Sequence, residues 1–181
     1  MAQVKSTGRP IRIMFQDESR FGRISDPKAC WAMMPIRPTV GSQMVREYVY
    51  VFRAVSPQDG QHDSLILPRA NTESMSMFLD EVRHRHPDEY IVMVMDQAGW
   101  HRAEKLRIPH NMELVFLPPY SPDLNPQEQI WDELREKFFS NRLFKSLQAV
   151  IETAAGGLQR LESMPALIKS LSHRNCILNA S

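Results

Sequence analysis

The run Tyr90–Met95 (YIVMVM) is apolar throughout and is followed directly by an acid, Asp96. A run without alternation is typical of a strand that is covered on both faces, as in a sheet between two layers of helices. We therefore expect a central buried strand that ends at Asp96. A carboxylate placed there starts partly desolvated, so Asp96 is a candidate for chemistry, although an acid at a strand end is also a common turn residue.

The other strands are predicted from short apolar or β-branched runs bounded by turn residues. Residues 19–44 are rich in Gly and Pro and are expected to be mostly loop. The expected strands are Ile11–Gln16, Val45–Val55, Ser64–Leu67 and Glu113–Leu117, with a further short strand around Cys30–Met33.

Helices are predicted from capping residues and from apolar spacing at i, i+3, i+4 and i+7. We expect a helix after the N-cap Asn71 that ends before Pro87, and others over Arg102–Arg107, from Pro126 to about Phe139, over Ser146–Glu162 and over Pro165–Leu171. Gly156 and Gly157 are expected to interrupt or loosen the fourth of these. A hairpin-rich first half followed by alternating strands and helices predicts an α/β fold, with a mixed sheet and helices on its faces.

Three acids are singled out by their positions. Asp17 follows the first predicted strand, Asp96 follows the most apolar one, and Glu128 lies one turn into the helix after the last strand. In open α/β sheets, sites form outside the carboxyl ends of the strands, so these side chains could meet at one edge. Clustered carboxylates are costly to keep ionised without a cation, and Mg²⁺ prefers such hard oxygen ligands.

Glu128 also has a structural interpretation. Asn125-Pro126-Gln127-Glu128 fits a capping box, with Asn125 as N-cap, Pro126 at the first helical position and Glu128 at the third. The pattern leaves both roles open. Trp131 and Leu134 are expected to be core residues of the same helix.

Composition narrows the class of protein. The formal net charge is only +1, which gives no support for nucleic-acid binding, and no apolar run approaches the length of a membrane helix. The N-terminal residues lack the apolar core of a secretory signal. Cys30 and Cys176 lie far apart in the sequence, so a disulfide framework or zinc site is not expected, and a cytoplasmic location is the default.

Three stretches together resemble the catalytic domain of DDE transposases, in the bacterial insertion-sequence branch of the mariner-like superfamily. They are IMFQDESRFGR, VMVMDQAGWHR and LVFLPPYSPDLNPQEQIWDELR, and the third is the most specific. The resemblance runs from about Ile11 to about Leu161. It implies a ribonuclease H-like fold with a mixed five-stranded sheet, formed by a catalytic domain over residues 11–162 between a tail (1–10) and a C-terminal helical tail (163–181).

The resemblance also implies an activity. Asp17, Asp96 and Glu128 fall on the family's metal-binding acids, which hold two Mg²⁺ or Mn²⁺ ions for DNA cleavage and strand transfer without a covalent enzyme intermediate. The alternatives are a ribonuclease H-like nuclease that only hydrolyses, and a catalytically silent DNA-binding domain derived from a transposase. The gap between Asp96 and Glu128 holds 31 residues, a few fewer than is usual, and Gln97 replaces the common Asn or Gly; neither departure removes a ligand.

The family implies DNA as the partner, a homodimer in the DNA complex, and a nucleoid-associated protein in the cytoplasm. Few residues precede the first strand, so we expect the helix-turn-helix module that recognises element ends to come from a separate protein or reading frame. Trp31 and Arg37 loosely match a family loop. The candidate DNA contacts are His101, Arg135, Lys137, Arg142 and Lys145. The alternatives are solvated helix faces for the four cations and packing against Trp100 for His101.

Overall fold

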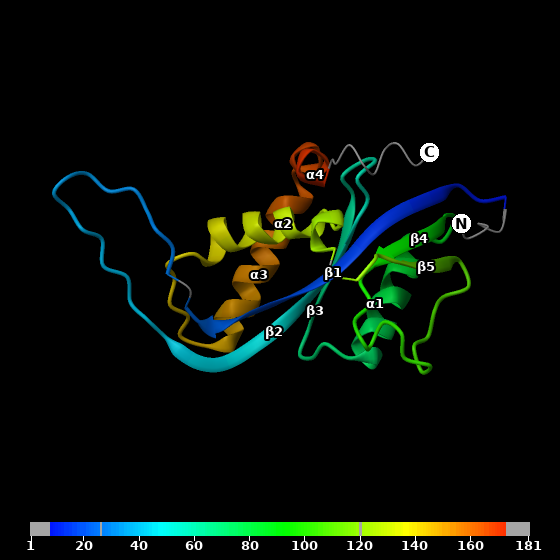
Figure 1. Ribbon diagram of the computed structural model, residues 1–181, viewed down its shortest axis with the longest axis horizontal. Helices are drawn as coiled ribbons and strands as arrows, with labels where there is room; N and C mark the ends of the chain where they lie inside the picture. The colour runs from blue at the N-terminus through cyan, green and yellow to red at the C-terminus, as the bar shows by residue number, and fades with distance from the viewer. Residues whose placement is uncertain (1–7, 26, 120, 173–181) are drawn as a thin grey trace.

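The computed structural model describes residues 8–25, 27–119 and 121–172 of the chain. These residues form a five-stranded sheet and the helices that cover it (Figure 1). The elements in chain order are β1 (Ile11–Ile24), β2 (Met44–Val55), β3 (His62–Leu67), α1 (Thr72–Arg85), β4 (Tyr90–Met95), β5 (Met112–Phe116), the 3₁₀ turn η1 (Pro122–Leu124), α2 (Gln127–Leu134), its π-helical continuation η2 (Arg135–Phe139), α3 (Leu147–Glu162) and α4 (Pro165–Ser172).

The sheet is mixed, with the strand order β3-β2-β1-β4-β5. β2 runs antiparallel to both β1 and β3, whereas β1 with β4 and β4 with β5 are parallel pairs. The apolar run of β4 is explained by packing on both faces of the sheet, because Ile91, Met93 and Met95 belong to one core and Val94 packs against the other. β1 rather than β4 occupies the middle of the sheet. The predicted α/β fold with a mixed five-stranded sheet is thus confirmed.

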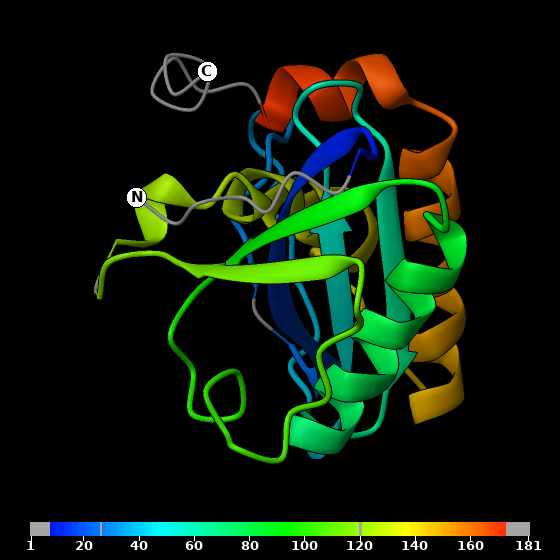
Figure 2. The same ribbon diagram turned by 90° about the vertical axis from the view of Figure 1, so that its right-hand side faces the viewer.

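Helices cover both faces of the sheet, because alternate strand residues point into two different cores (Figures 1 and 2). Met14 and Phe52 belong to the core under α1, where they meet Phe78. Phe15 and Val51 belong to the core under α2, α3 and α4. The second core extends into α4, so the helical part of the predicted C-terminal tail packs onto the domain.

Three details of the predicted elements are wrong. The first strand does not end at Gln16 but continues to Ile24, because β2 goes on pairing with it after β4 has ended. Residues 102–107 form turns and loop rather than a helix. β5 is an edge strand with mostly half-buried residues, not a fully buried one.

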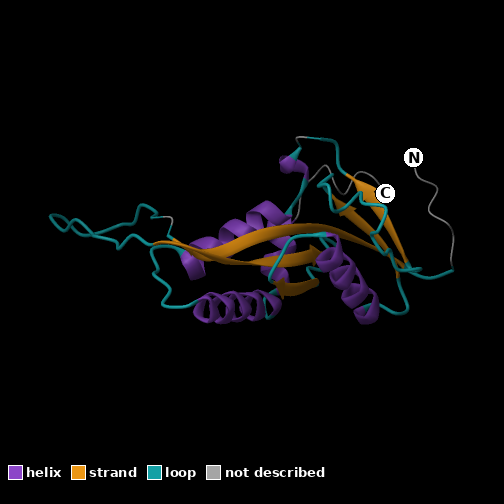
Figure 3. Ribbon diagram, turned by 90° about the horizontal axis from the view of Figure 1, so that it is seen from below, coloured by secondary structure: helices purple, strands orange, loops and turns teal. Residues whose placement is uncertain are grey.

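A long loop joins β1 to β2 and extends away from the body of the domain (Figures 1 and 3). Residues 27–43 contain neither strand nor helix, so the strand predicted around Cys30–Met33 is also wrong. Trp31 and Met34 near its tip are almost fully exposed. Cys30 is exposed as well, and Cys176 lies outside the described residues.

The glycine pair in α3 does not interrupt the helix as predicted. Gly157 is buried where α3 meets α2 and η2, and a Cβ there would lie 2.5 Å from Leu134 Cδ1 and 3.2 Å from the ring of Phe138. Gly156, one residue earlier, has nothing within 4 Å of an added Cβ. Gly157 therefore serves the close approach of two helices, whereas Gly156 has no such constraint.

These two glycines give a matched pair of predictions. Gly156→Ala should raise the free energy of unfolding by ~0.5–1 kcal/mol, because alanine stabilises an exposed helix position relative to glycine. Gly157→Ala should lower it by about 1 kcal/mol, since the new methyl group displaces Leu134 and Phe138 in a packed core. Urea denaturation of both variants measures the difference. Equal stabilisation by both alanines would show that the α3–α2 contact is not close.

None of the helices in the described part of the chain combines the length and apolarity that a membrane crossing requires.

Candidate active site

Asp17 and Asp96 lie together because two neighbouring parallel strands stop pairing just before them. The last pair between β1 and β4 joins Phe15 to Val94. Each acid comes two residues after that pair, Asp17 within the continuing β1 and Asp96 directly after β4. The expectation that the two acids meet at one edge is met, but Asp17 is an inner residue of a strand rather than its end.

Glu128 reaches the same place from the first turn of α2. All three acids line one pocket of about 460 Å³, together with residues from the β4–α2 segment. The rest of the lining consists of Gln97, Ala98, Leu117, Pro118, Pro119, Ser121 and Asn125. The proline-rich stretch after β5 therefore forms one wall of the pocket and leads the chain into α2.

The carboxylate of Asp17 is held by two donors in a largely buried position. Trp131 Nε1 donates to its Oδ2 over 2.9 Å, and the Glu18 amide donates to its Oδ1 over 2.9 Å. Burial raises the pKa of Asp17 to about 7; the Trp131 hydrogen bond opposes this rise, and the charges of Glu18 and Glu128 add to it. The pocket thus keeps one carboxyl group whose ionisation is costly without a cation.

This pKa predicts a pH-dependent gain in stability for Asp17→Asn. The folded protein holds a proton on Asp17 up to about pH 7, whereas the unfolded chain releases it near 3.8. Stability is therefore lost as pH rises between these values, and asparagine removes that loss. Chemical denaturation with a chelator present should show Asp17→Asn more stable than wild type by on the order of 2 kcal/mol near pH 8, and nearly equal near pH 4. A difference that does not change with pH would contradict a buried, titrating Asp17.

Asp96 is held by a histidine from the loop that follows it. His101 Nδ1 lies 2.8 Å from Asp96 Oδ1, and His101 Nε2 lies 2.8 Å from Glu18 Oε1. Desolvation lowers the pKa of His101, but its hydrogen bonds with Asp96 and Glu18 outweigh this effect and raise the pKa to about 9. The hydrogen bond from His101 in turn lowers the pKa of Asp96. Trp100 Nε1 donates to the same Glu18 oxygen over 3.1 Å.

This position differs from the DNA contact predicted for His101. The residue is 2% exposed and lies between two carboxylates, so its ring orients Asp96 rather than facing solvent. Gln97 lines the pocket of the acids, and its Nε2 donates to the Leu117 carbonyl over 2.8 Å, which ties the end of β4 to the end of β5.

The predicted capping box is not formed. The N-cap of α2 is Pro126, which makes no side-chain capping bond, and Asn125 Oδ1 accepts from the Gln127 amide over 3.1 Å rather than from the Glu128 amide. Asn125 Nδ2 donates to the Gln16 carbonyl over 3.0 Å and so ties the segment before α2 to β1. Within the described residues, no hydrogen bond joins the Glu128 carboxylate to the Asn125 amide, and Glu128 is exposed. The Glu128 carboxylate is therefore available to the pocket.

Gln127 attaches the start of α2 to two strands. Its Nε2 donates to the carbonyls of Phe15 (2.7 Å) and Arg53 (3.1 Å), and its Oε1 accepts from Arg53 Nη1 over 3.1 Å. Gln127 and Arg53 are both fully buried, and Nε and Nη2 of Arg53 have no hydrogen-bond partner among the described residues. Arg53 also lies opposite Asp17 in the β1–β2 register. This network fixes α2 beside β1, next to Glu128.

The four predicted cationic contacts lie on the segment after Glu128. Arg135 is half-buried and donates to Ser19 Oγ, while Arg142 is exposed and donates to the Phe138 carbonyl over 3.2 Å. Lys137 pairs with Glu133, and Lys145 is exposed just before α3. Arg135 and Arg142 are brought to one pocket, whereas Lys137 and Lys145 do not line it.

The donor set fits a hard divalent cation, since three carboxylates line one pocket and the buried one is costly to ionise alone. Across residues 8–25, 27–119 and 121–172, no group of three or more His, Cys, Asp or Glu side chains is close enough to hold an ion as it stands. Asp96 is engaged by His101, so its carboxylate would have to turn before it could act as a ligand.

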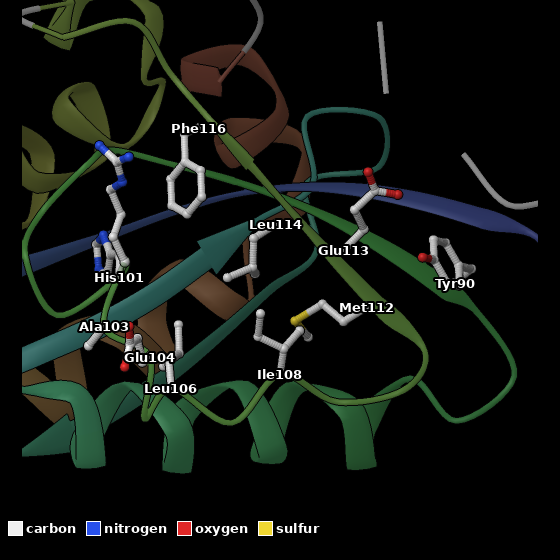
Figure 4. A pocket seen from close by; sticks show the side chains of 11 residues that line it. Tyr90, His101, Ala103, Glu104, Leu106, Ile108, Met112, Glu113, Leu114 and Phe116 are labelled. Atoms are coloured by element: carbon white, nitrogen blue, oxygen red, sulfur yellow. The ribbon is translucent and has the colours of Figure 1, made fainter. Parts of the chain in front are cut away.

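A larger pocket of about 680 Å³ lies between β5 and the loop after Asp96, and it contains none of the three acids (Figure 4). Leu106, Ile108, Met112 and Leu114 form an apolar part of its lining, and His101 lies at one end. The catalytic candidates are therefore in the smaller, more polar pocket.

The sequence analysis did not predict that Glu18, Arg53 and Gln127 support the acids. It also did not predict the hydrogen bond from Trp131 to Asp17. Two of these residues carry a signal. Gln127 precedes Ile130, Trp131 and Leu134 at helical spacing, which places a polar group on the buried stripe. Arg53 is the one charged residue in the otherwise apolar run over residues 48–55 of β2.

Comparisons with known proteins find sequences similar to this chain. A family model described as DDE superfamily endonuclease matches residues 12–151. The uncharacterized protein y4pE/y4sA of Sinorhizobium fredii (strain NBRC 101917 / NGR234) is 38% identical over 128 residues, which is 70% of this chain and 95% of that protein.

Solved structures share the fold at low sequence identity. The Mos1 mariner paired-end complex with Mn has a TM-score of 0.57 and 16% identity over 90% of this chain and 56% of that one. The Mos1 transposase paired-end complex with the left transposon end gives 0.55 and 15%, over 89% and 55%. The simian T-cell lymphotropic virus intasome with PP2A regulatory subunit B56 gamma gives 0.52 and 10%, over 81% and 48%. The chain thus spans just over half the length of the Mos1 chains that it matches.

Proposed function

This chain belongs to the DDE superfamily of endonucleases, and from that membership we propose that it is a transposase catalytic domain that cuts DNA and joins the cut strand to a target. The observation that carries the proposal is the pocket in which Asp17, Asp96 and Glu128 meet from β1, β4 and α2. The ribonuclease H-like fold, which it shares with the Mos1 transposase, supports the same reading.

We propose that Asp17 and Asp96 are shared ligands of two Mg²⁺ or Mn²⁺ ions and that Glu128 completes one of the two sites. The Mos1 complex with Mn supports a divalent cation in a domain of this fold. When bound, the ions would activate the attacking oxygen and stabilise the leaving oxygen of a phosphodiester. The raised pKa of Asp17 means that binding a cation would be coupled to loss of a proton at that carboxyl group.

The residues around the acids have roles that do not depend on covalent catalysis. Trp131 holds the Asp17 carboxylate, and His101 holds that of Asp96 until a cation competes for it. Asn125 and Gln127 fix the first turn of α2 and with it Glu128. In this proposal the attacking group is water for cleavage and a DNA 3′-hydroxyl for strand transfer.

DNA is the proposed partner, with Arg135, Lys137, Arg142 and Lys145 as contacts to its phosphates. A homodimer on DNA, a separate helix-turn-helix module and a nucleoid location stay predictions, as does the division into a tail over residues 1–10, a catalytic domain over 11–162 and a C-terminal segment over 163–181. Gel filtration with and without DNA tests the dimer.

The proposal is tested with an end-labelled duplex that contains the inverted repeats flanking the gene, incubated with Mg²⁺ or Mn²⁺ and a target plasmid. Cleavage at the repeat followed by joined products supports a strand transferase. Cleavage without joined products would favour the nuclease that only hydrolyses. Binding without cleavage in either metal would favour a silent DNA-binding domain.

A further inference from the structure

A second pocket, lined by cations, lies beside the carboxylates on the far half of β1. It has a volume of about 160 Å³ and is formed by β1, the start of the long loop after it, and the segment from η2 to Phe144. Four of its lining residues are cationic: Arg20, Lys28, Arg135 and Arg142. Among the residues that the structure describes, none that lines it is an acid, although the chain as a whole is almost neutral.

The cations are held from separate elements around an apolar floor. Arg135 donates to Ser19 Oγ, and the Arg20 guanidinium lies 5.0 Å from the centre of the Tyr48 ring. Phe21 and Phe144 of the floor are 3% and 8% exposed. A floor of buried aromatic rings lowers the local dielectric, which strengthens attraction between these cations and an anion.

Two acids lie nearby, but they line an adjoining pocket rather than the cationic one. Asp132 and Glu136 line the adjoining pocket of about 830 Å³, which shares Lys28 and Arg135 with the cationic one. The Asp132 carboxylate is 3.8 Å from Arg135 Nη1, at the limit of an ion pair, and is 78% exposed. It therefore leaves most of the Arg135 charge free for another partner.

The cationic pocket lies at a fixed distance along β1 from the carboxylates. Trp131 contacts Asp17, and Arg135, one helical turn later, contacts Ser19, so the segment follows β1 from the acids to the cations. A strand rises about 3.3 Å per residue, which places Arg20 and Phe21 roughly 10–13 Å from Asp17. DNA advances about 3.4 Å along its axis per phosphate of one strand, and because the strand also winds around the axis, successive phosphates lie farther apart than this rise. The distance along β1 therefore corresponds to about two nucleotides.

From this geometry we propose that the pocket lined by Arg20, Arg135 and Arg142 is a subsite for one backbone phosphate, about two nucleotides from the scissile phosphate at the carboxylates. The proposal deepens the proposed function and rests on it. The subsite fixes how the strand lies across the domain and carries no sequence information, since phosphate contacts position DNA and do not read its bases.

The test combines a double variant with phosphate neutralisation. Arg20→Ala/Arg142→Ala and the control Arg69→Ala, an exposed arginine after β3, are compared on a labelled duplex whose cleavage position by wild type has been mapped. Affinity is measured without metal over a range of salt. The double variant should bind roughly tenfold more weakly and reduce the slope of log K against log salt by about 1, because one phosphate contact is lost, whereas Arg69→Ala should match wild type.

Methylphosphonates are then placed singly within six nucleotides of the cleavage position. In wild type, one at about the second nucleotide should weaken binding, and in the double variant the same substitution should have no further effect. If the methylphosphonates weaken binding equally at every position, or if the salt slope of the double variant equals that of wild type, the subsite proposal is wrong. Cleavage by wild type would still support the proposed function. A wild type that neither binds nor cuts any duplex overturns both.

Discussion

Asp96→Asn and Glu128→Gln are each expected to lower the rate of metal-dependent DNA cleavage by at least ~10³-fold, with little effect on folding. Loss of one charged group that acts on the transition state commonly has an effect of this size. The fold should survive because asparagine keeps the Oδ1 that accepts from His101 and the Ala98 amide, and because Glu128 is exposed and makes no capping bond to Asn125 in the described structure. Single-turnover cleavage and thermal unfolding measure the two effects.

Matched acids elsewhere in the chain provide the controls. Asp88→Asn, in the exposed turn before β4, and Glu152→Gln, on the exposed face of α3, change the same chemical groups outside the pocket. Both should cleave at the wild-type rate. If Asp96→Asn or Glu128→Gln cleaves as fast as these controls, the assignment of the three acids is wrong.

Gln127→Leu is expected to lower the free energy of unfolding by ~2–4 kcal/mol. The change removes the acceptor of Arg53 Nη1 and two donated hydrogen bonds, and it leaves a fully buried guanidinium with no side-chain acceptor. Burial already lowers the pKa of Arg53, which shows that the charge is poorly accommodated. Hydrogen bonds to buried charged groups contribute more than neutral ones, and an orphaned charge is costly.

Two further variants show whether the loss comes from the orphaned charge. Gln129→Leu changes an exposed glutamine of the same helix and should stay within about 0.5 kcal/mol of wild type. Arg53→Met/Gln127→Leu replaces both partners with apolar groups and should recover much of the stability lost by Gln127→Leu. If the double variant is less stable than Gln127→Leu alone, the unpaired Arg53 charge is not the cause of the lost stability.

Much of this fold could be predicted from the sequence because local signals and burial agree. The apolar run of β4, the hairpin of β2 and β3, and Asn71 capping α1 through the Ser74 amide at 2.8 Å all follow from nearby residues. The predicted helix at residues 102–107 is wrong: the segment forms turns and loop next to the larger pocket, where Leu106 packs against the core under α1 and the Arg107 amide donates to Ser76 Oγ. The Ser76 hydroxyl belongs to α1, which lies far along the chain from the segment.

The position of the site was also predictable, but the way its acids are held was not. The end of β4 indicated Asp96, and the sequence after β5 indicated Glu128. The continuation of β1 past Asp17 depends on β2, which pairs with residues up to Ile24 and lies far along the chain. Likewise, the contacts of Trp131 with Asp17 and of His101 with Glu18 join residues that are more than eighty positions apart. Such pairs are set by tertiary packing, which no local pattern encodes.

The central claim is that Asp17, Asp96 and Glu128 together hold the ions for DNA cleavage. Anomalous diffraction from crystals of the DNA complex grown with Mn²⁺ tests it most directly. We predict anomalous peaks within about 2.0–2.2 Å of carboxylate oxygens of Asp17 and Asp96, with Glu128 bound to one of them and His101 no longer paired with Asp96. Peaks bound only to other residues, with the Asp96–His101 contact intact, would contradict the account.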